Sequence, residues 1–140
     1  MDWKDVINEI RRVLMKHHHE ITTAPCLSDF PNGSCEAANI IAYEILCQKG
    51  FEPELVKGYW DDGNEYHCWL RCCGELADIT FEQMDEGSEL FFKSEALPQY
   101  AKYEIDKTSA NEYHKIKDCF KRRPYDLKAT VDFVLSKMGN

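Results

Sequence analysis

The chain has 140 residues, 44% of them hydrophobic, and a formal net charge of −8. This length and apolar content predict one domain, residues 1–140, around its own core. The acidic charge belongs to the first hundred residues, because residues 101–140 carry 9 basic and 6 acidic side chains, so nucleic acid is not an expected partner. With no run of eighteen apolar residues and no signal peptide, we expect a cytoplasmic protein without membrane association and with its 7 cysteines reduced.

Periodicity and turn residues predict helices that flank a group of short strands. The expected elements, in chain order, are a helix from about Trp3 to Lys16, a loop through Pro31, a helix between Ser34 and Gly50, a strand around Leu55–Tyr59, a turn at 61–64, a strand pair within 65–81, a mixed region from Met84 to Asp118 and a helix near Tyr125–Met138. Helices on a mainly antiparallel sheet make the expected fold class α+β.

The second helix is apolar almost all round. Ser34 is its expected N-cap, and Glu36, Glu44 and Gln48 recur at multiples of four as one narrow polar stripe. Most of its circumference must then be covered by protein, which predicts a central helix. Cys35 falls in its first turn, where unpaired N–H groups and the positive end of the helix dipole lower the pKa of a thiol.

Residues 65–81 are predicted to form a hairpin with a two-residue turn at Cys73-Gly74. Such a turn pairs residue 68 with 79, 70 with 77 and 66 with 81. Alternation then collects the apolar side chains on one face, namely Tyr66, Cys68, Leu70, Cys72, Ala77, Ile79 and Phe81. The hydrophobic pattern and the turn therefore select the same register.

The same register places His67 and Asp78 on the other face as diagonal neighbours, within reach of an imidazole–carboxylate hydrogen bond. A thiol nucleophile needs a base, and the base needs an acceptor that fixes its tautomer. Cys35, His67 and Asp78 are therefore our candidate nucleophile, base and orienting acid. The alternative is that Cys35 is an ordinary first-turn residue or part of a degenerate site, and that Asp78 is a solvated acid.

Three motifs carry a family resemblance: the stretch Phe30-Pro31-Asn32-Gly33-Ser34-Cys35, the pair His67-x-Trp69, and the pair Asp78-x-Thr80. Over about residues 26–84 the chain resembles the transglutaminase-like branch of the papain-like cysteine peptidase superfamily. In that branch a cysteine opens a central helix, and the His and Asp lie on successive strands. The resemblance implies a papain-like, transglutaminase-like core and a Cys-His-Asp triad.

Two features depart from this family pattern. Asp29 stands six residues before Cys35, where papain-type enzymes place an oxyanion-binding Gln, and an ionised Asp has no proton to donate. The hairpin between His67 and Asp78 is also too short for the long connection of large transglutaminases. Hydrolysis or deamidation is therefore expected rather than cross-linking.

The function expected from these residues is thiol-dependent hydrolysis of an amide in a peptide, a protein or a small molecule, without a cofactor or metal. The Cys35 N–H would be one oxyanion donor and Asn32 a candidate for the other, while Trp60 and Trp69 are candidates to line the cleft. Two alternatives remain open: a catalytically inactive binding or immunity module with this fold, and a cysteine acyltransferase.

The remaining cysteines and histidines support plainer interpretations. A zinc site built from His67, Cys68, Cys72 and Cys73 is disfavoured, because alternation sends 68 and 72 to one face and 67 and 73 to the other. Small apolar packing residues are expected at Cys26, Cys47, Cys68, Cys72 and Cys119.

Overall fold

The computed structural model describes residues 1–105 and 120–139, in which helices flank one antiparallel sheet. The helices are α1 (Trp3–His17), α2 (Cys35–Gln48), α3 (Pro98–Ala101) and α5 (Leu127–Lys137), and the strands are β1 (Glu54–Trp60), β2 (Glu65–Cys72), β3 (Glu75–Ala77), β4 (Phe91–Phe92) and β5 (Glu104–Ile105). Short 3-10 helices cover His18–Glu20, Pro25–Leu27 and Phe81–Gln83. The α+β class is confirmed, and none of the described helices is long and apolar enough to cross a membrane.

Side-chain caps fix where α1 and α5 begin. At α1, the Asp2 carboxylate accepts from the Asp5 N–H at 2.9 Å, and the Asp5 carboxylate accepts from the Asp2 N–H. The last helix begins at Leu127 rather than near Tyr125, because the Asp126 side chain caps it by accepting from the Ala129 N–H at 3.0 Å.

The sheet has the strand order β4-β3-β2-β1-β5, so β2 lies at its centre. The turn predicted at 61–64 joins β1 to β2, and β2 joins β3 through the predicted two-residue turn. In that turn Cys73 and Gly74 have φ of 54° and 77°, the left-handed pair that a type I′ hairpin requires. Leu70 pairs with Ala77, which confirms the predicted register next to the turn.

The predicted pairing of residues 68 with 79 and 66 with 81 is wrong, because β3 ends at Ala77. The Asp78 N–H donates to the Leu90 carbonyl at 2.7 Å, and the Phe81 N–H donates back to the Asp78 carbonyl as a 3-10 turn begins. Phe81 therefore leaves the hairpin, and Tyr66, without its expected neighbour, is 46% exposed. The chain bends away at the residue whose carboxylate serves the candidate site.

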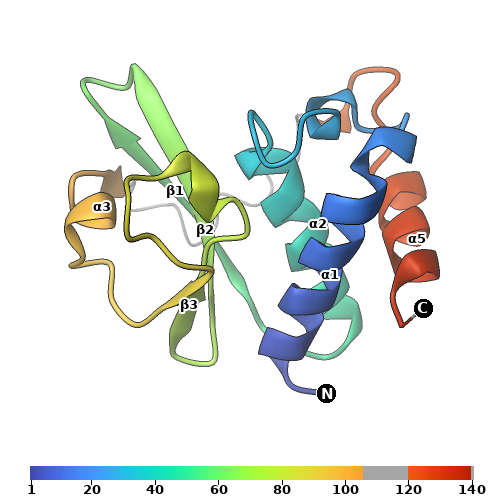
Figure 1. The fold of residues 1–140 in the computed structure, drawn as a ribbon, viewed down its shortest axis with the longest axis horizontal. Helices are drawn as coiled ribbons and strands as arrows, with labels where there is room; N and C mark the ends of the chain where they lie inside the picture. Colours follow the sequence, from blue (N-terminus) through green and yellow to red (C-terminus); the bar gives the residue numbers. More distant parts are fainter. Residues whose placement is uncertain (106–119, 140) are drawn as a thin grey trace.

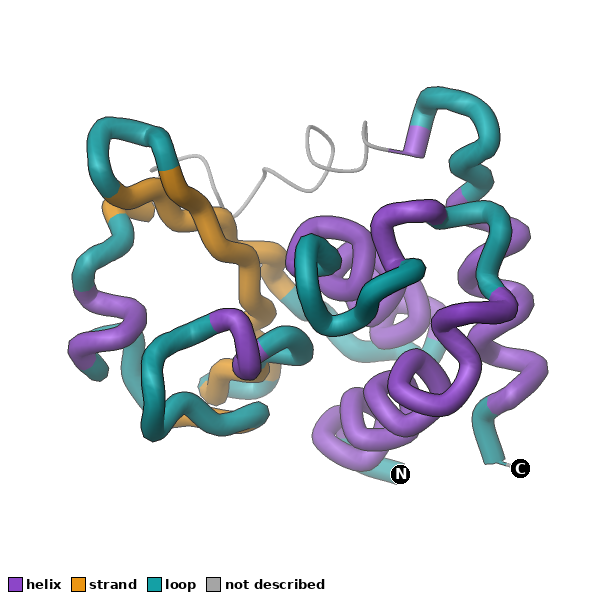
Figure 2. The backbone as a smooth tube through the Cα atoms, turned by 45° about the horizontal axis from the view of Figure 1, so that its top comes forward, coloured by secondary structure: helices purple, strands orange, loops and turns teal. Residues whose placement is uncertain are grey.

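Helix α2 is central, as predicted. It packs against β1 and β2 on one side and against α1 and α5 on the other, and Figures 1 and 2 show the three long helices gathered beside the sheet. Its polar stripe is half-buried at Glu36 and Glu44 and exposed at Gln48, whereas Ile40, Ile41 and Ile45 are fully buried. The helix that carries Cys35 is thus fixed in the middle of the main core.

A second, smaller apolar cluster covers the other face of the sheet, on the side of α3 (Figure 1). It consists of Val56, Trp69, Leu76, Phe92 and Tyr100, with Tyr103 packed against it. Strand alternation sends Leu70 into the main core and Trp69 into this cluster. The candidate site lies between the two.

Candidate active site

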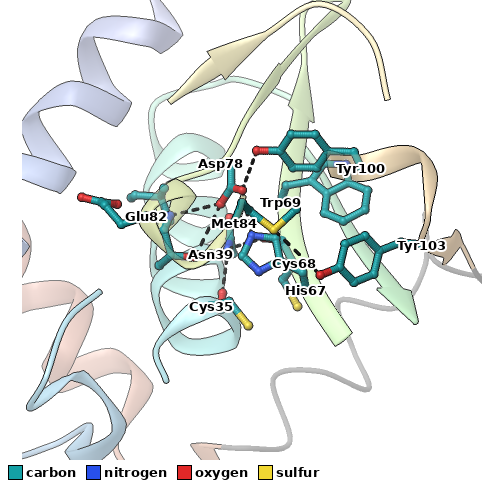
Figure 3. A network of polar contacts seen from close by, with 12 residues as sticks. Cys35, Asn39, His67, Cys68, Trp69, Asp78, Glu82, Met84, Tyr100 and Tyr103 are labelled. Atoms are coloured by element: carbon teal, nitrogen blue, oxygen red, sulfur yellow. Dashed lines mark hydrogen bonds and ion pairs between the residues drawn. The ribbon is translucent and has the colours of Figure 1, made fainter. Parts of the chain in front are cut away.

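His67 and Asp78 are hydrogen bonded, as the hairpin register predicts. The His67 Nε2 lies 2.7 Å from the Asp78 Oδ2 (Figure 3). Both side chains are buried, with 3% exposure for His67 and none for Asp78. A carboxylate and an imidazole removed from water in this way are strongly coupled, and Nδ1 is left as the imidazole nitrogen that can serve a nucleophile.

Two further groups hold the Asp78 carboxylate in place. The Tyr100 hydroxyl donates to Oδ2 at 2.8 Å, and the Thr80 N–H donates to Oδ1 at 3.2 Å. Three donors therefore satisfy a fully buried charge, which would otherwise be costly. Thr80 belongs to the predicted Asp78-x-Thr80 motif, whereas Tyr100, on α3, was missed because it lies 22 residues away with no local signal.

Cys35 opens α2 and is 7% exposed. Ser34 occupies the N-cap position, but its hydroxyl donates to the carbonyls of Cys26 and Asn32, at 2.9 and 3.0 Å, and does not cap the helix. The first-turn N–H groups beside the Cys35 sulfur are therefore left without a side-chain acceptor. They supply the positive helix end that stabilises a thiolate or an oxyanion.

Hydrogen bonds set the charges of Cys35 and His67. Bonds from the Cys68 thiol and then from His67 outweigh burial and lower the pKa of Cys35 to about 5. Burial alone would lower the pKa of His67, but its hydrogen bonds to Asp78 and Cys35 raise it to about 9. At neutral pH the pair is therefore a thiolate beside an imidazolium, with Asp78 on the far side of the ring.

Aromatic rings fix the plane of the imidazole. Trp69 stacks at 6.2 Å between ring centroids, and Tyr103 lies at 6.3 Å. Gly58, paired with His67 across β1 and β2, leaves room for both rings, since a Cβ there would lie 2.6 Å from the Tyr103 Cβ. Neither Gly58 nor Tyr103 was predicted from the sequence.

Cys35 and His67 open onto a pocket of about 340 Å³, the size of a small-ligand site. Its lining is polar and lies on the loop before α2, the 61–64 turn with the start of β2, the 3-10 turn after Asp78, and the segment after α3. The lining residues are Gly33, Cys35, Asn64, Glu65, Tyr66, His67, Gln83 and Tyr103. Two uncharged amide donors, Asn64 and Gln83, thus line the same pocket as the thiol.

Three residues expected to bind substrate lie elsewhere. Trp69 is fully buried behind His67, with its indole N–H donated to Glu95 at 2.9 Å, so the prediction that it lines the cleft is wrong. Trp60 is 40% exposed at the end of β1, where the Lys102 ammonium covers its ring. Asn32 turns its side-chain amide toward Asp29 at 3.4 Å, outside the pocket lining.

The packing prediction for the other cysteines holds in part. Cys68 and Cys72 are buried and Cys26 is half-buried, whereas Cys47, at the exposed end of α2, is in solvent, and Cys119 lies outside the described residues. Within the part of the chain that the structure describes, no three His, Cys, Asp or Glu side chains gather as ligands for a metal ion.

Comparison of the chain with protein-family models, curated proteins and solved structures gave no match. The function of this chain is therefore inferred from its own site.

Proposed function

We propose that this protein is a thiol-dependent hydrolase of amide bonds. The observation that carries the proposal is the buried hydrogen bond between His67 and Asp78, beside an open pocket that both His67 and Cys35 line. A nucleophile, a base and an orienting group in that order are the parts that covalent acyl chemistry requires.

In the first half of the reaction, the Cys35 thiolate attacks the carbonyl carbon of the amide. The imidazolium of His67 gives its Nδ1 proton to the departing nitrogen, which leaves as an amine or as ammonia and yields a thioester on Cys35. Asp78 keeps its carboxylate and holds Nε2–H, so the ring stays in one orientation throughout.

In the second half, neutral His67 takes a proton from a water molecule, and the hydroxide that forms attacks the thioester. Collapse of the tetrahedral intermediate releases the acid and restores the thiolate and the imidazolium. The Cys35 N–H, at the uncapped start of α2, is the first oxyanion donor. Gln83 and Asn64 line the pocket, which supports one of them rather than Asn32 as the second oxyanion donor.

The finer fold assignment belongs to the same proposal. A Cys at the start of a central helix, with the His on β2 and the Asp directly after the adjacent strand β3, supports a transglutaminase-like member of the papain-like superfamily. Asp29, in the place of the usual Gln, is exposed and engaged with Asn32, which agrees with an oxyanion site built from other donors.

An activated ester tests this chemistry without knowledge of the natural substrate. The protein is mixed with p-nitrophenyl acetate, and nitrophenolate release is followed together with the mass of the acylated chain. We expect a burst with one acetyl group on Cys35, followed by steady turnover. Cys35→Ala should lose both phases. The matched control is Cys47→Ala, at the exposed other end of α2 and outside the pocket lining, and it should retain both.

Equal hydrolysis by the Cys35→Ala variant would overturn the proposal and favour a binding module. A burst without turnover, followed by rapid release when an amine is added, would overturn hydrolysis in favour of acyl transfer. Ammonia or amine release from glutamine-containing and ordinary peptides would then identify the class of amide that the site accepts.

A further inference from the structure

A second thiol lies against the candidate nucleophile. Cys68, on the α2-facing side of β2, is fully buried, and its carbonyl accepts from the Asn39 side chain at 3.2 Å. The same Asn39 nitrogen donates to the Cys35 carbonyl at 2.6 Å. One amide group thus ties together the two backbone segments that carry the cysteines, and Figure 3 shows both sulfur atoms on the same side of the His67 ring.

The two thiols lie close enough to influence each other, and they differ in charge. The Cys68 S–H donates to the Cys35 sulfur, which raises the pKa of Cys68 and lowers that of Cys35. Cys35 lines the pocket and can meet a small solute, whereas Cys68 lies behind it. An accessible thiolate backed by a protonated thiol is the arrangement of a peroxide-sensitive cysteine with its resolving partner.

We propose that Cys35 and Cys68 form a reversible disulfide when a hydroperoxide enters the pocket. The Cys35 thiolate attacks one oxygen of hydrogen peroxide, breaks the O–O bond and becomes a sulfenic acid, and hydroxide leaves. The Cys68 sulfur then attacks the Cys35 sulfur. The S–S bond forms, the S–O bond breaks, and the hydroxyl group leaves as water with the Cys68 proton.

The disulfide has two consequences for the site. It removes the nucleophile, so the oxidised protein is inactive, and it prevents further oxidation of Cys35 to the sulfinic acid, which dithiols do not reduce. This inference goes beyond the proposed hydrolysis, because it requires an accessible thiolate and a neighbouring thiol but no acyl chemistry.

Other cysteines must be separated from this pair in any test. Cys72 and Cys73 have sulfur atoms 3.7 Å apart at the β2–β3 turn and are a possible second oxidised pair. Burial and, more weakly, the nearby charge of Cys35 raise the pKa of Cys26, which shares the tryptic peptide of Cys35, residues 17–49. Cys68 is the one cysteine in peptide 58–71, so trypsin distinguishes its bonds from those of Cys72 and Cys73.

The experiment uses the reduced full chain. Hydrogen peroxide is added, free thiols are blocked with N-ethylmaleimide, and the unreduced tryptic digest is analysed by mass spectrometry. We expect peptide 17–49 linked to peptide 58–71, with fragment ions that place the bond at Cys35. Labelling of Cys35 by iodoacetamide should disappear with peroxide and return fully with dithiothreitol.

Cys68→Ala is the decisive variant, and Cys26→Ala is its control. In Cys68→Ala, peroxide should convert Cys35 to sulfinic acid, and dithiothreitol should not restore labelling, whereas Cys26→Ala should behave like the native chain. Should Cys68→Ala not fold, the native chain decides alone: sulfinic acid on Cys35 without the linked peptides overturns the proposal.

The two proposals fail separately. A linked Cys35–Cys68 pair in a protein without ester turnover would leave the redox site standing and remove the hydrolase. Ester turnover that peroxide destroys irreversibly, without a link, would do the opposite.

Discussion

The charge of Asp78 is the most direct point at which to perturb the site, and Asp78→Asn removes it without changing the volume. The carboxylate accepts from His67 and Tyr100 through Oδ2 and from Thr80 through Oδ1. An amide has only one acceptor oxygen. This oxygen should take the Oδ2 position, where it accepts from both His67 and Tyr100, so that the Thr80 N–H is the one donor left facing an NH₂ group. The imidazole keeps its hydrogen bond and loses its counter-charge.

The cost can be worked from these contacts. One buried donor without an acceptor should lower the free energy of unfolding by about 1–3 kcal/mol. Loss of an adjacent opposite charge shifts a pKa by about 1–3 units, so the pKa of His67 should fall from about 9 toward neutrality, and that of Cys35 should rise as the imidazolium is lost. The thiolate at pH 6 should then become scarcer by about tenfold, and turnover, which also needs the imidazolium as acid, should fall by about 10²–10⁴.

The assay is the rate of Cys35 alkylation by iodoacetamide as a function of pH, with mass spectrometry to assign the label. In Asp78→Asn the rising limb of the profile should move to higher pH. Asp132→Asn, which neutralises an exposed acid on α5, is the control and should leave the profile unchanged. An unaltered profile in a folded Asp78→Asn protein would show that the carboxylate does not set the charge of the thiol–imidazole pair.

Three further outcomes are expected. Amide hydrolysis should rise through about pH 5 as Cys35 ionises and fall through about pH 9 as His67 loses the proton that the departing nitrogen needs, and a rising limb near the ordinary thiol value would contradict the ion pair. Cys35→Ser should abolish turnover and change the free energy of unfolding in urea by less than about 1 kcal/mol, whereas Ile41→Ala should cost about 2–5 kcal/mol through a cavity; equal costs would make Cys35 a packing residue. Tyr100→Phe removes one donor from Asp78 and should cost about 1.5–3 kcal/mol in the same melts, with turnover reduced less than in Asp78→Asn; an unchanged melt would mean that this bond contributes nothing.

Local patterns in the sequence predict the parts of the site that depend on short-range geometry. The apolar circumference of α2 indicates a central helix, and Cys73-Gly74 selects a turn whose register brings His67 and Asp78 together. Both features follow from fixed periods, 3.6 residues for a helix and 2 for a strand. Distant residues need not be known for either of them.

The parts that were missed depend on long-range packing. The segment 81–105, which contributes Gln83, Tyr100 and Tyr103, consists of short elements without clear periodicity. The positions of these elements depend on how they pack against the sheet. The same packing explains why Trp69 does not line the cleft. Alternation correctly places it on the same face of β2 as His67, but α3 packs on that face and buries it.

The position of Cys68, on the other face of β2, also could not be predicted fully from local patterns. Alternation correctly predicts that it faces the helices. Whether it meets an apolar side chain or the first turn of α2 depends on how far along the strand the helix is placed. Asn39 fixes that position through hydrogen bonds to the carbonyls of Cys35 and Cys68, a contact across 29 residues that no local pattern encodes.

Gly58→Ala tests whether this long-range packing serves the chemistry as well as the fold. The added Cβ would lie 2.6 Å from the Tyr103 Cβ and 3.0 Å from the Trp69 Cη2. A Cβ cannot rotate away from its own backbone, so the segment that carries Tyr103 must move, at a cost of about 1–3 kcal/mol. Because both rings flank His67, the imidazole should lose its fixed plane and ester turnover should fall by at least tenfold, about the effect of a misplaced catalytic group.

Val134→Ala supplies the comparison for that loss. Val134 is fully buried on α5, and its truncation should cost a similar free energy of about 2 kcal/mol. Measured by urea melts and ester turnover together, the α5 variant should remain active while Gly58→Ala does not. Equal activity in two variants of equal stability would mean that His67 needs no aromatic support, and that Gly58 is required only for the close packing of β1 against the segment that carries Tyr103.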